Sequence, residues 1–413
     1  MKSWLEEKLL ALNGTTTMNK ANGFTRLGYS EEEWSAMNVF QSIAHSLGLA
    51  VRRDAAGNMI ARWETRENQH LPAVATGSHL DTVINGGGYD GVAGVLTGLA
   101  AIKRLQDENF ISDYPIEVIC FASEESSRFN VSTFGSKAMA GLWKESFANL
   151  KDRNGTTLKS AMESLGLTWE RVPLAERSSE EIKSFIELHI EQGPVLENKE
   201  LDFGVVDGIA CPIRLLVKVT GKAGHTGTTP MTHRNDALVA IAPLITFVQE
   251  RAIQIEKEFA RPIVATVSTM KVEPNAMNVI PETVTVGIDI RSVYDDLKAK
   301  LYAEIETFCT KKMIQSGIQI DIQKIVDNPS IFLNKSLSQR LKQVGESLNY
   351  KGIVMNSGAG HDVMNMAQKW PTAMLFIPCR DGLSHHPDEF TSLNDLHKGT
   401  EILAAFLRLE AMK

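Results

Sequence analysis

The stretch Ala73-Val-Ala-Thr-Gly-Ser-His-Leu-Asp81 is an apolar run that ends in an imidazole and a carboxylate. A short apolar run bounded by turn residues is typical of a buried strand. His79 and Asp81 are two residues apart, so on a strand both side chains lie on one face. We therefore expect a strand here with a polar pair at its end.

Strands and helices alternate on both sides of this stretch. Small and branched apolar residues at helical spacing follow it, and two continuous apolar runs predict further buried strands. The pattern returns near the end of the chain. The expected segments are helix 91–107, strand 116–122, strand 185–189, a helix from Ser336 to Leu348, strand 372–377 and helix 393–412. This alternation predicts an α/β domain with a mostly parallel sheet.

The pattern changes after Ala210, where a separate block of elements begins. The expected order is strand 214–221, helix 236–259 with Asp236 as its cap, strands 263–272 and 283–291, helix 296–316 and strand 318–325. This β-α-β-β-α-β order is that of a ferredoxin-like α+β domain. We expect an inserted lid and dimerisation domain at 211–326, and a discontinuous catalytic domain at 1–210 and 327–413.

The bulk properties predict a soluble, cytoplasmic protein. A chain of 413 residues is longer than a single core usually grows, and its net charge of −7 lacks the basic footprint of a nucleic-acid partner. Its four scattered cysteines indicate free thiols in a reducing compartment. The longest apolar stretch, Ala237 to Val248, contains Pro243 and is too short to span a bilayer, so no membrane partner is expected.

Three acidic residues stand at turns beside the expected strands. Asp90 follows a glycine-rich turn, where a carboxylate can bridge two metals; the alternative is a cap for the helix from Gly91, and the two roles are compatible. Glu124 and Glu125 follow strand 116–122 and should face opposite ways. We expect Glu125 to bind metal and Glu124 to serve as the general base for a metal-bound water, the alternative being a solvated acidic loop.

Histidines supply the remaining donors. We expect His79 to bind metal, with Asp81 fixing its tautomer, although a simple strand-end pair is the alternative. His189 ends strand 185–189 and could instead be a satisfied buried histidine. His385 and His386 are adjacent, so only one should point at the metals. Imidazoles and carboxylates in this number are the donor set of a two-metal hydrolase.

The inserted block carries three further candidates. His225 lies in a glycine-rich loop, and with Asn278 it could donate hydrogen bonds to a developing oxyanion. Arg291 ends a strand and could hold a substrate carboxylate with its two-pronged guanidinium. Turn residues and a solvated strand-end arginine are the alternatives.

Three motifs give the chain a family resemblance: Gly-Ser-His79-Leu-Asp81-Thr-Val, Glu-Leu-His189-Ile-Glu-Gln192-Gly and Ser357-Gly-Ala-Gly-His361-Asp362. Together they resemble the amidase, hydantoinase and carbamoylase branch of the aminoacylase/carboxypeptidase-G-like metallohydrolases, over nearly the whole chain. That branch includes N-carbamoyl-L-amino-acid hydrolases and allantoate amidohydrolases. Its peptidase relatives tend to have a carboxylate where this chain has His189.

The resemblance implies a role for each candidate. One metal would be held by His79, Asp90 and His189, and the other by Asp90, Glu125 and His385, with His386 a non-ligand. Glu124 would be the base, and His225 would act in the partner subunit's site of a homodimer. The implied substrate-binding positions are Gln192, Asn278, Arg291, Ala359 and Gly360. One departure is Ser126, which stands where related enzymes carry glycine after the Glu-Glu pair.

These observations predict a dinuclear amidohydrolase that cleaves a linear, non-peptide C–N bond in a small carboxylate-bearing substrate. The expected substrate is an N-carbamoyl-L-amino acid, with allantoate as the alternative. Two more distant alternatives are an aminopeptidase or dipeptidase and a metal-free binding protein. The mixed nitrogen and oxygen donors suit zinc, manganese, cobalt and nickel, so the metal stays open.

Overall fold

The computed structural model describes residues 1–316 and 318–413, which form two compact units. The first unit comprises Met1–Asp207, Leu333–Met355 and His361–Lys413. The second unit comprises Gly208–Phe332 and the short segment Asn356–Gly360. Each unit has its own hydrophobic core.

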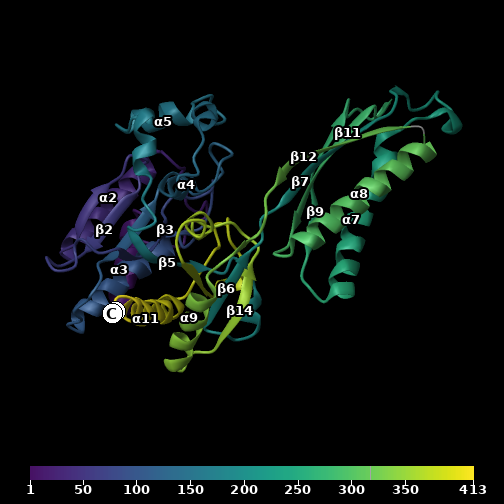
Figure 1. Ribbon diagram of the computed structural model, residues 1–413. Coiled ribbons are helices and arrows are strands. Elements are labelled where there is room, and N and C mark those ends of the chain that lie inside the picture. Colours follow the sequence, from purple (N-terminus) through teal and green to yellow (C-terminus); the bar gives the residue numbers. More distant parts are fainter. Residues whose placement is uncertain (317) are drawn as a thin grey trace. The chain divides into compact units, whose positions relative to one another are not determined.

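The first unit contains most of the helices and the larger sheet (Figure 1). Its helices are α1 (Lys2–Leu12), α2 (Glu31–Ser46), α3 (Val92–Asp107), α4 (Phe134–Ala140), α5 (Leu158–Ser164), α6 (Val195–Asn198), α9 (Lys335–Ser347), α10 (Val363–Met366) and α11 (Leu393–Glu410). The strands are β1 (Ala50–Arg53), β2 (Met59–Trp63), β3 (Ala73–His79), β4 (Ile116–Phe121), β5 (Ile182–Ile190), β6 (Phe203–Ile209), β14 (Gly352–Ser357) and β15 (Thr372–Ile377). The two-residue strand β13 (Ile331–Phe332) pairs with the end of β6.

The strand order in this sheet is β1-β2-β4-β3-β5-β15-β6-β13, with β14 beside β6. The four central strands β4, β3, β5 and β15 are parallel, as predicted, while the pairs β1–β2, β2–β4 and β15–β6 are antiparallel. Every residue of β3, β4 and β15 is buried, which explains their continuous apolar sequences. The carboxyl ends of parallel strands meet at one edge of a sheet, and ligands typically bind there.

Side-chain caps define several helix starts. Ser30 caps α2 by accepting the Glu33 N–H, and Ser392 caps α11 by accepting the Asp395 N–H. Asp236 caps the helix that follows it, as predicted, by accepting the N–H groups of the second and third helical residues. These caps satisfy backbone donors that have no partner within their helix.

The second unit has the expected ferredoxin-like order. Its main elements are β7 (Ile213–Thr220), α7 (Ala237–Phe259), β9 (Val264–Glu273), β11 (Thr283–Arg291), α8 (Asp295–Ser316) and β12 (Gln319–Asp327). The strands pair antiparallel in the order β12-β7-β11-β9. The two helices lie on one side of this sheet (Figure 1) and contact each other through stacked Phe247 and Phe308, whose ring centroids are 4.4 Å apart.

Helix α7 corrects one expectation about the apolar stretch. It runs for 23 residues with Pro243 inside it, and by length and composition alone it is apolar enough to cross a membrane. Its buried residues are Ala237, Ile241, Leu244, Val248, Ala252 and Ile255, which recur every three or four positions. That spacing is typical of a helix that packs one stripe against a sheet, and α7 contacts β7, β9 and β11.

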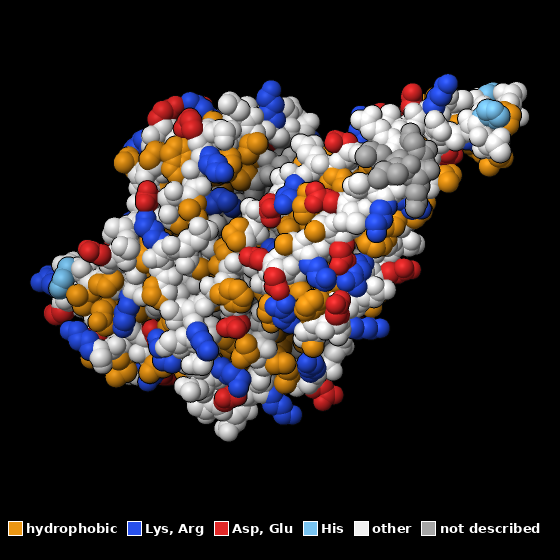
Figure 2. Space-filling view, turned by 45° about the vertical axis from the view of Figure 1, so that its right-hand side comes forward, with side chains coloured by type: hydrophobic (Ala, Val, Ile, Leu, Met, Phe, Trp, Pro, Cys, Tyr) orange, Lys and Arg blue, Asp and Glu red, His pale blue; other side chains and the backbone are white. Residues whose placement is uncertain are grey.

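The surface carries charges of both signs. On the face drawn in Figure 2, basic and acidic side chains are interspersed with apolar ones. The mixed charges agree with the small net charge of the sequence. All four cysteines are buried.

Candidate metal centre

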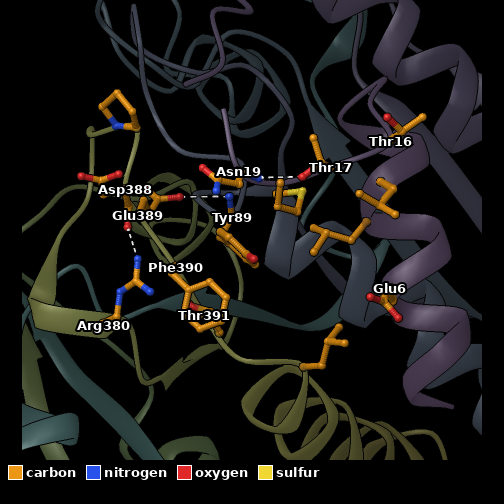
Figure 3. Close-up of a pocket in the computed structure, with 15 residues that line it drawn as sticks. Glu6, Thr16, Thr17, Asn19, Tyr89, Arg380, Asp388, Glu389, Phe390 and Thr391 are labelled. Carbon is orange, nitrogen blue, oxygen red and sulfur yellow. Dashed lines mark hydrogen bonds between the residues drawn. The ribbon is translucent and has the colours of Figure 1, made fainter. Parts of the chain in front are cut away.

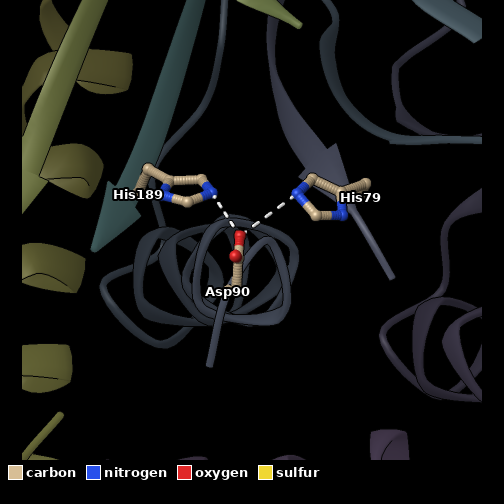
Figure 4. A group of neighbouring side chains, drawn as sticks. All are labelled: His79, Asp90 and His189. Atoms are coloured by element: carbon tan, nitrogen blue, oxygen red, sulfur yellow. Dashed lines mark ion pairs between the residues drawn. The ribbon is translucent and has the colours of Figure 1, made fainter. Parts of the chain in front are cut away.

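Two strand ends and one turn bring together His79, Asp90 and His189 (Figure 4). His79 is the last residue of β3, His189 lies near the end of β5, and Asp90 immediately precedes the turn into α3. The Asp90 Oδ1 atom is 3.4 Å from His79 Nε2 and 3.0 Å from His189 Nε2. All three side chains are buried. The predicted first ligand set therefore converges on one carboxylate oxygen.

The other oxygen of Asp90 faces a second group. His385 Nε2 lies 3.1 Å from Asp90 Oδ2 and 3.2 Å from Glu125 Oε1. Asp90, Glu125 and His385 thus form a second cluster of donor atoms within 4.8 Å of one another, and Asp90 belongs to both clusters. The neighbouring His386 is exposed, and its Nδ1 accepts the Asp388 N–H instead.

The turn after Asp90 needs a glycine. Gly91 has a φ of 65°, and a Cβ atom added there would lie 2.5 Å from the His79 ring. Gly91 is also the N-cap residue of α3, and no side chain caps that helix. The alternative interpretation of Asp90 as a helix cap is therefore wrong: its carboxylate faces the histidines instead.

The Glu124-Glu125 pair follows a sharp turn at the end of β4. Ser123 has a φ of 52°, so the chain leaves the extended conformation before the pair. Glu124 Oε2 lies 3.8 Å from His79 Nε2, whereas Glu125 faces His385. Both glutamates are only 7% exposed, which contradicts the alternative of a solvated acidic loop. Ser126, by contrast, is exposed and leaves the pair uncrowded.

Asp81 lies between His79 and the acidic pair. Its carboxylate is 3.3 Å from His79 Nδ1, and its main-chain oxygen is 3.0 Å from the same nitrogen. The two carboxylate oxygens also accept the N–H groups of Glu124 and Glu125, at 3.0 and 2.9 Å. One buried aspartate therefore contacts both the histidine and the backbone of the acidic pair.

The electrostatics of the cluster come from burial and close charge pairs. Burial opposes ionisation of Asp90, but hydrogen bonds from His189, His385 and His79 hold its pKa well below the ordinary value. Hydrogen bonds to Asp90 and Glu125 raise the pKa of His385 to about 11. Burial raises the pKa of Glu124 well above its ordinary value, and repulsion from Glu125 adds to this effect.

The donor set fits divalent metal ions. Carboxylates and imidazoles, all of them buried except His385, bring their donor atoms within 4.8 Å of one another in each cluster. Converging buried acids repel one another, and a divalent cation offsets that repulsion. Mixed imidazole and carboxylate donors are typical of zinc and other first-row metals.

Gln192 contacts this centre directly. Its Nε2 donates to Asp90 Oδ2 at 2.9 Å and to Ser384 Oγ at 3.0 Å. Its Oε1 is buried and, among the described residues, has no hydrogen-bond partner. Gln192 thus lies beside the carboxylate shared by the two clusters, with one acceptor atom still unused.

Glu389 was not identified from the sequence, although its carboxylate binds the backbone N–H of Asp90. Glu389 Oε1 accepts the N–H groups of Tyr89 and Asp90, both at 2.9 Å, and Oε2 accepts the Ser384 hydroxyl. A Cβ atom at Gly87 would lie 2.2 Å from this carboxylate, so the glycine-rich turn makes room for it. The available signal was its position four residues after His385.

Glu389 also faces a hollow on the surface of the first unit (Figure 3). The hollow has a volume of about 700 Å³ and is lined in part by Tyr89, Arg380, Phe390 and the N-terminal helix. The Arg380 guanidinium lies over the Phe390 ring and donates to the Asp388 main-chain oxygen. The Arg380 guanidinium therefore already has partners among the residues that line this hollow.

A second missed group surrounds His189. The His361 ring packs edge-on against the His189 ring, with centroids 4.5 Å apart, and burial holds the pKa of His361 well below its ordinary value. Asp362 accepts the Ser136 hydroxyl at 2.5 Å. Glu187 accepts the Ser78 hydroxyl and the Val363 N–H, both at 2.8 Å. His361 and Asp362 lie within a recognised motif, but the sequence assigned them no role.

The remaining candidates lie in the second unit. His225 is in the two-residue strand β8 (Gly224–His225), which pairs with β10 (Val279–Ile280) directly after Asn278. The Asn278 main-chain oxygen accepts the Thr226 N–H at 3.2 Å, and both His225 and Asn278 are exposed. The structure therefore brings His225 and Asn278 together within their own unit.

Arg291 is held by its neighbours, contrary to the alternative of a solvated arginine. Its Nε and Nη2 atoms donate to the two oxygens of Asp289, at 2.7 and 3.3 Å. Its Nη1 donates to the Gly358 main-chain oxygen at 2.6 Å. Arg291 thus lies beside the loop that contains Ala359 and Gly360.

Comparisons with known proteins identify the family. Residues 75–409 match the model of peptidase family M20/M25/M40. The chain is 35% identical over 387 residues to an N-carbamoyl-L-amino-acid amidohydrolase of Paenarthrobacter aurescens, covering 94% of this chain and 93% of that protein. It is 36% identical over 394 residues to an allantoate amidohydrolase of Escherichia coli, covering 94% and 93%.

Among solved structures, the chain resembles an amidase of the hydantoinase/carbamoylase family from Burkholderia multivorans. The TM-score is 0.89 at 29% sequence identity, and the match covers 100% of this chain and 98% of the other. The similarity therefore extends over both units and is not restricted to the clustered donors.

Proposed function

The chain belongs to peptidase family M20/M25/M40, and we propose that within this family it hydrolyses N-carbamoyl-L-amino acids. It is an amidohydrolase acting on C–N bonds other than peptide bonds. The proposed products are the free L-amino acid, ammonia and carbon dioxide. The observation that carries this proposal is the pair of histidine and carboxylate clusters that share Asp90, with Glu124 beside them.

Two divalent ions per subunit would occupy these clusters. His79, Asp90 and His189 would hold one ion, and Asp90, Glu125 and His385 the other. When bound, such ions polarise a carbonyl group and lower the pKa of water. Zinc, manganese, cobalt and nickel all suit this donor set.

Glu124 would act as the general base. It is buried, it lies next to the clusters, and it belongs to neither of them. Its carboxylate would take a proton from the attacking water and return it to the leaving nitrogen. Asp81 would assist by orienting the His79 ring and by holding the Glu124 N–H.

Polar side chains and backbone groups would bind the substrate. His225 and Asn278 would donate hydrogen bonds to the tetrahedral oxyanion. Arg291 would hold the substrate carboxylate, because its ion pair with Asp289 keeps the guanidinium plane in one orientation. Gln192 and the Ala359-Gly360 backbone would complete the binding surface.

The protein would be a cytoplasmic homodimer in which His225 acts across subunits. Large apolar side chains are exposed on the second unit: Val239 is 69% exposed, Val264 62% and Ile253 44%. Exposed apolar surface of this kind is typical of subunit interfaces. Sedimentation should give a dimer, and a fully active monomer would contradict this part of the proposal.

Allantoate is the second candidate substrate. The chain is as similar to an allantoate amidohydrolase as to an N-carbamoyl-L-amino-acid amidohydrolase, and both substrates carry a ureido group and a carboxylate. An aminopeptidase or dipeptidase activity is a more distant alternative. His189, where peptidase relatives tend to have a carboxylate, counts against it.

The test is ammonia release by the manganese-loaded protein from a panel of N-carbamoyl-L-amino acids and from allantoate. A chelated sample serves as the control, and a dipeptide panel tests the peptidase alternative. Turnover of carbamoyl compounds alone would support the proposal. Turnover of allantoate alone would replace its substrate and leave every ligand assignment unchanged, and silence on all ureido substrates would overturn it.

A further inference from the structure

Three consecutive backbone N–H groups at the acidic pair are held by two buried carboxylates. The Ser123 N–H donates to Glu33 Oε1 at 2.7 Å. The next two N–H groups, those of Glu124 and Glu125, donate to the two oxygens of Asp81. Successive N–H groups in a turn conformation can form a concave anion-binding nest. Here the protein's own carboxylates fill that nest.

Glu33 reaches this turn from helix α2, 90 positions away in sequence. Ser30 and Glu33 have the spacing of a capping box, in which the glutamate side chain normally bonds back to the cap residue's own N–H. Half of that motif forms, because Ser30 accepts the Glu33 N–H at 3.2 Å. The Glu33 carboxylate bonds instead to the Tyr29 N–H at 2.5 Å and to the Ser123 N–H. The Glu33 carboxylate therefore does not complete the capping box of its own helix.

Burying the Glu33 side chain is energetically unfavourable, and the segment next to it is closely packed. The side chain is 0% exposed, and burial raises its pKa to about 8. The segment just before helix α2 also packs closely against the turn at Ser123, since a Cβ atom at Gly28 would lie 2.3 Å from Ser123 Oγ. Burying a carboxylate is unfavourable unless it is hydrogen-bonded. The bond to Ser123 is one of the two that meet this requirement.

We propose that Glu33 is a positioning residue that holds the turn at Ser123, and thereby aims Glu124 at the reacting water and Glu125 at its metal. This inference rests on the proposed function of Glu124 and Glu125. Glu33 would work together with Asp81: Asp81 holds the N–H groups of the pair, and Glu33 holds the one before it. Without Glu33, the strained Ser123 would be free to relax and rotate the pair.

The first variant is Glu33→Met, which keeps the side-chain length and removes both acceptors. The matched control is Glu32→Gln, an exposed glutamate in the same first turn of α2. Misplacing a catalytic group by about 1 Å can cost about 100-fold in rate, so we expect kcat to fall about 10- to 100-fold. With both variants saturated with metal, KM should stay within about twofold of the control.

A second readout does not depend on activity. Hydrogen exchange at the amides of residues 123–125 should become faster in Glu33→Met and remain slow in Glu32→Gln. Glu33→Gln keeps one acceptor and should give intermediate values of both kcat and exchange. If Glu33→Met does not fold, Glu33→Gln carries the test with the same two readouts.

A merely structural glutamate would behave differently. It would lower the melting temperature while the folded, metal-loaded variant kept the kcat of the control, and that result would overturn the inference. Unchanged exchange at residues 123–125 would overturn it as well. If the wild-type protein turns over none of the ureido substrates, the proposed function fails, while the exchange measurement still decides whether Glu33 holds the turn.

Discussion

The acidic residues of the first unit and the polar residues of the second unit are held in very different ways. Asp90, Glu124 and Glu125 are buried, and the backbone N–H of each is bound by a buried carboxylate. His225 and Asn278 are exposed and lie at a ribbon of two-residue strands. The backbone is thus held most firmly at the acidic residues that lie close to one another. The two exposed residues, which are proposed to bind the substrate, remain accessible to solvent.

The largest expected effect comes from the most restrained region. Glu124→Gln removes the proposed base while its N–H bond to Asp81 stays available. General acid–base catalysis contributes about 10²- to 10⁴-fold, so kcat should fall by about 10³-fold. Bound metal, measured by elemental analysis, should not change, because Glu124 belongs to neither donor cluster. Loss of metal in this variant would make Glu124 a ligand and contradict its separate role.

The next effect tests the exposed region. His225→Ala should lower kcat by about 10²- to 10³-fold, the usual cost of losing one oxyanion donor, with metal content intact. His233→Ala, another exposed histidine in the same segment, is the matched control. Activity retained by His225→Ala would remove its role.

Mixing the two variants tests whether His225 acts across subunits. A dimer with one Glu124→Gln chain and one His225→Ala chain would contain one site with both groups intact. Random pairing should then restore about a quarter of wild-type activity, because about half of the dimers are mixed and each has one intact site of two. If His225 acts within its own chain, mixing restores nothing.

A smaller effect compares two adjacent histidines. His385→Ala should reduce bound metal from about two ions per chain to about one, because three protein ligands are typical of a catalytic site and one is lost. His386→Ala should leave the metal content unchanged, since His386 belongs to neither donor cluster and bonds to the Asp388 N–H. Equal losses in both variants would show that the two side chains exchange places.

The smallest expected effect is the release of protons when the metal binds. In the metal-free protein the pKa of His385 is about 11 and that of His79 is raised well above its ordinary value, so both carry protons at pH 7. A ligating imidazole must be neutral, so metal binding should release about one proton or more per ion at pH 7. Each of these imidazoles loses its proton only as the pH approaches its raised pKa. Metal affinity should therefore increase from pH 6.5 toward pH 11.

Calorimetric titration of the metal in two buffers with different ionisation enthalpies measures this release. His385→Ala should release fewer protons than the wild-type protein. Binding without proton release at pH 7 would contradict the charge state described for the cluster.

Much of the fold was predictable because it depends on local patterns. The continuous apolar sequence of β3 and the alternating sequence of β7 indicate strands buried on two faces and on one face. The predicted helix 236–259 matches α7, which continues to Phe259 with Pro243 inside it. The antiparallel flanks of the large sheet were missed, because pairing between distant strands has no local periodicity.

The candidate site was partly predictable for a similar reason. Chemistry-bearing side chains at the ends of parallel strands must meet at one edge of the sheet, so His79, Glu125 and His189 could be grouped from sequence. Glu33 and Glu389 lie outside the parallel strands and could not be grouped in this way, whereas Glu187 lies on β5 two residues before His189. Glu33 in particular has a sufficient local explanation as a capping residue.

The sequence by itself determined the strand and helix pattern, the ferredoxin-like order of the inserted block and the set of donors. Only the tertiary structure decided that Asp90 faces histidines instead of capping its helix, and that Glu33 and Glu389 bind the backbone beside the acidic residues. The reason is distance along the chain. Asp90 and Glu389 are 299 positions apart, and such a hydrogen bond exists only when packing brings the two segments together.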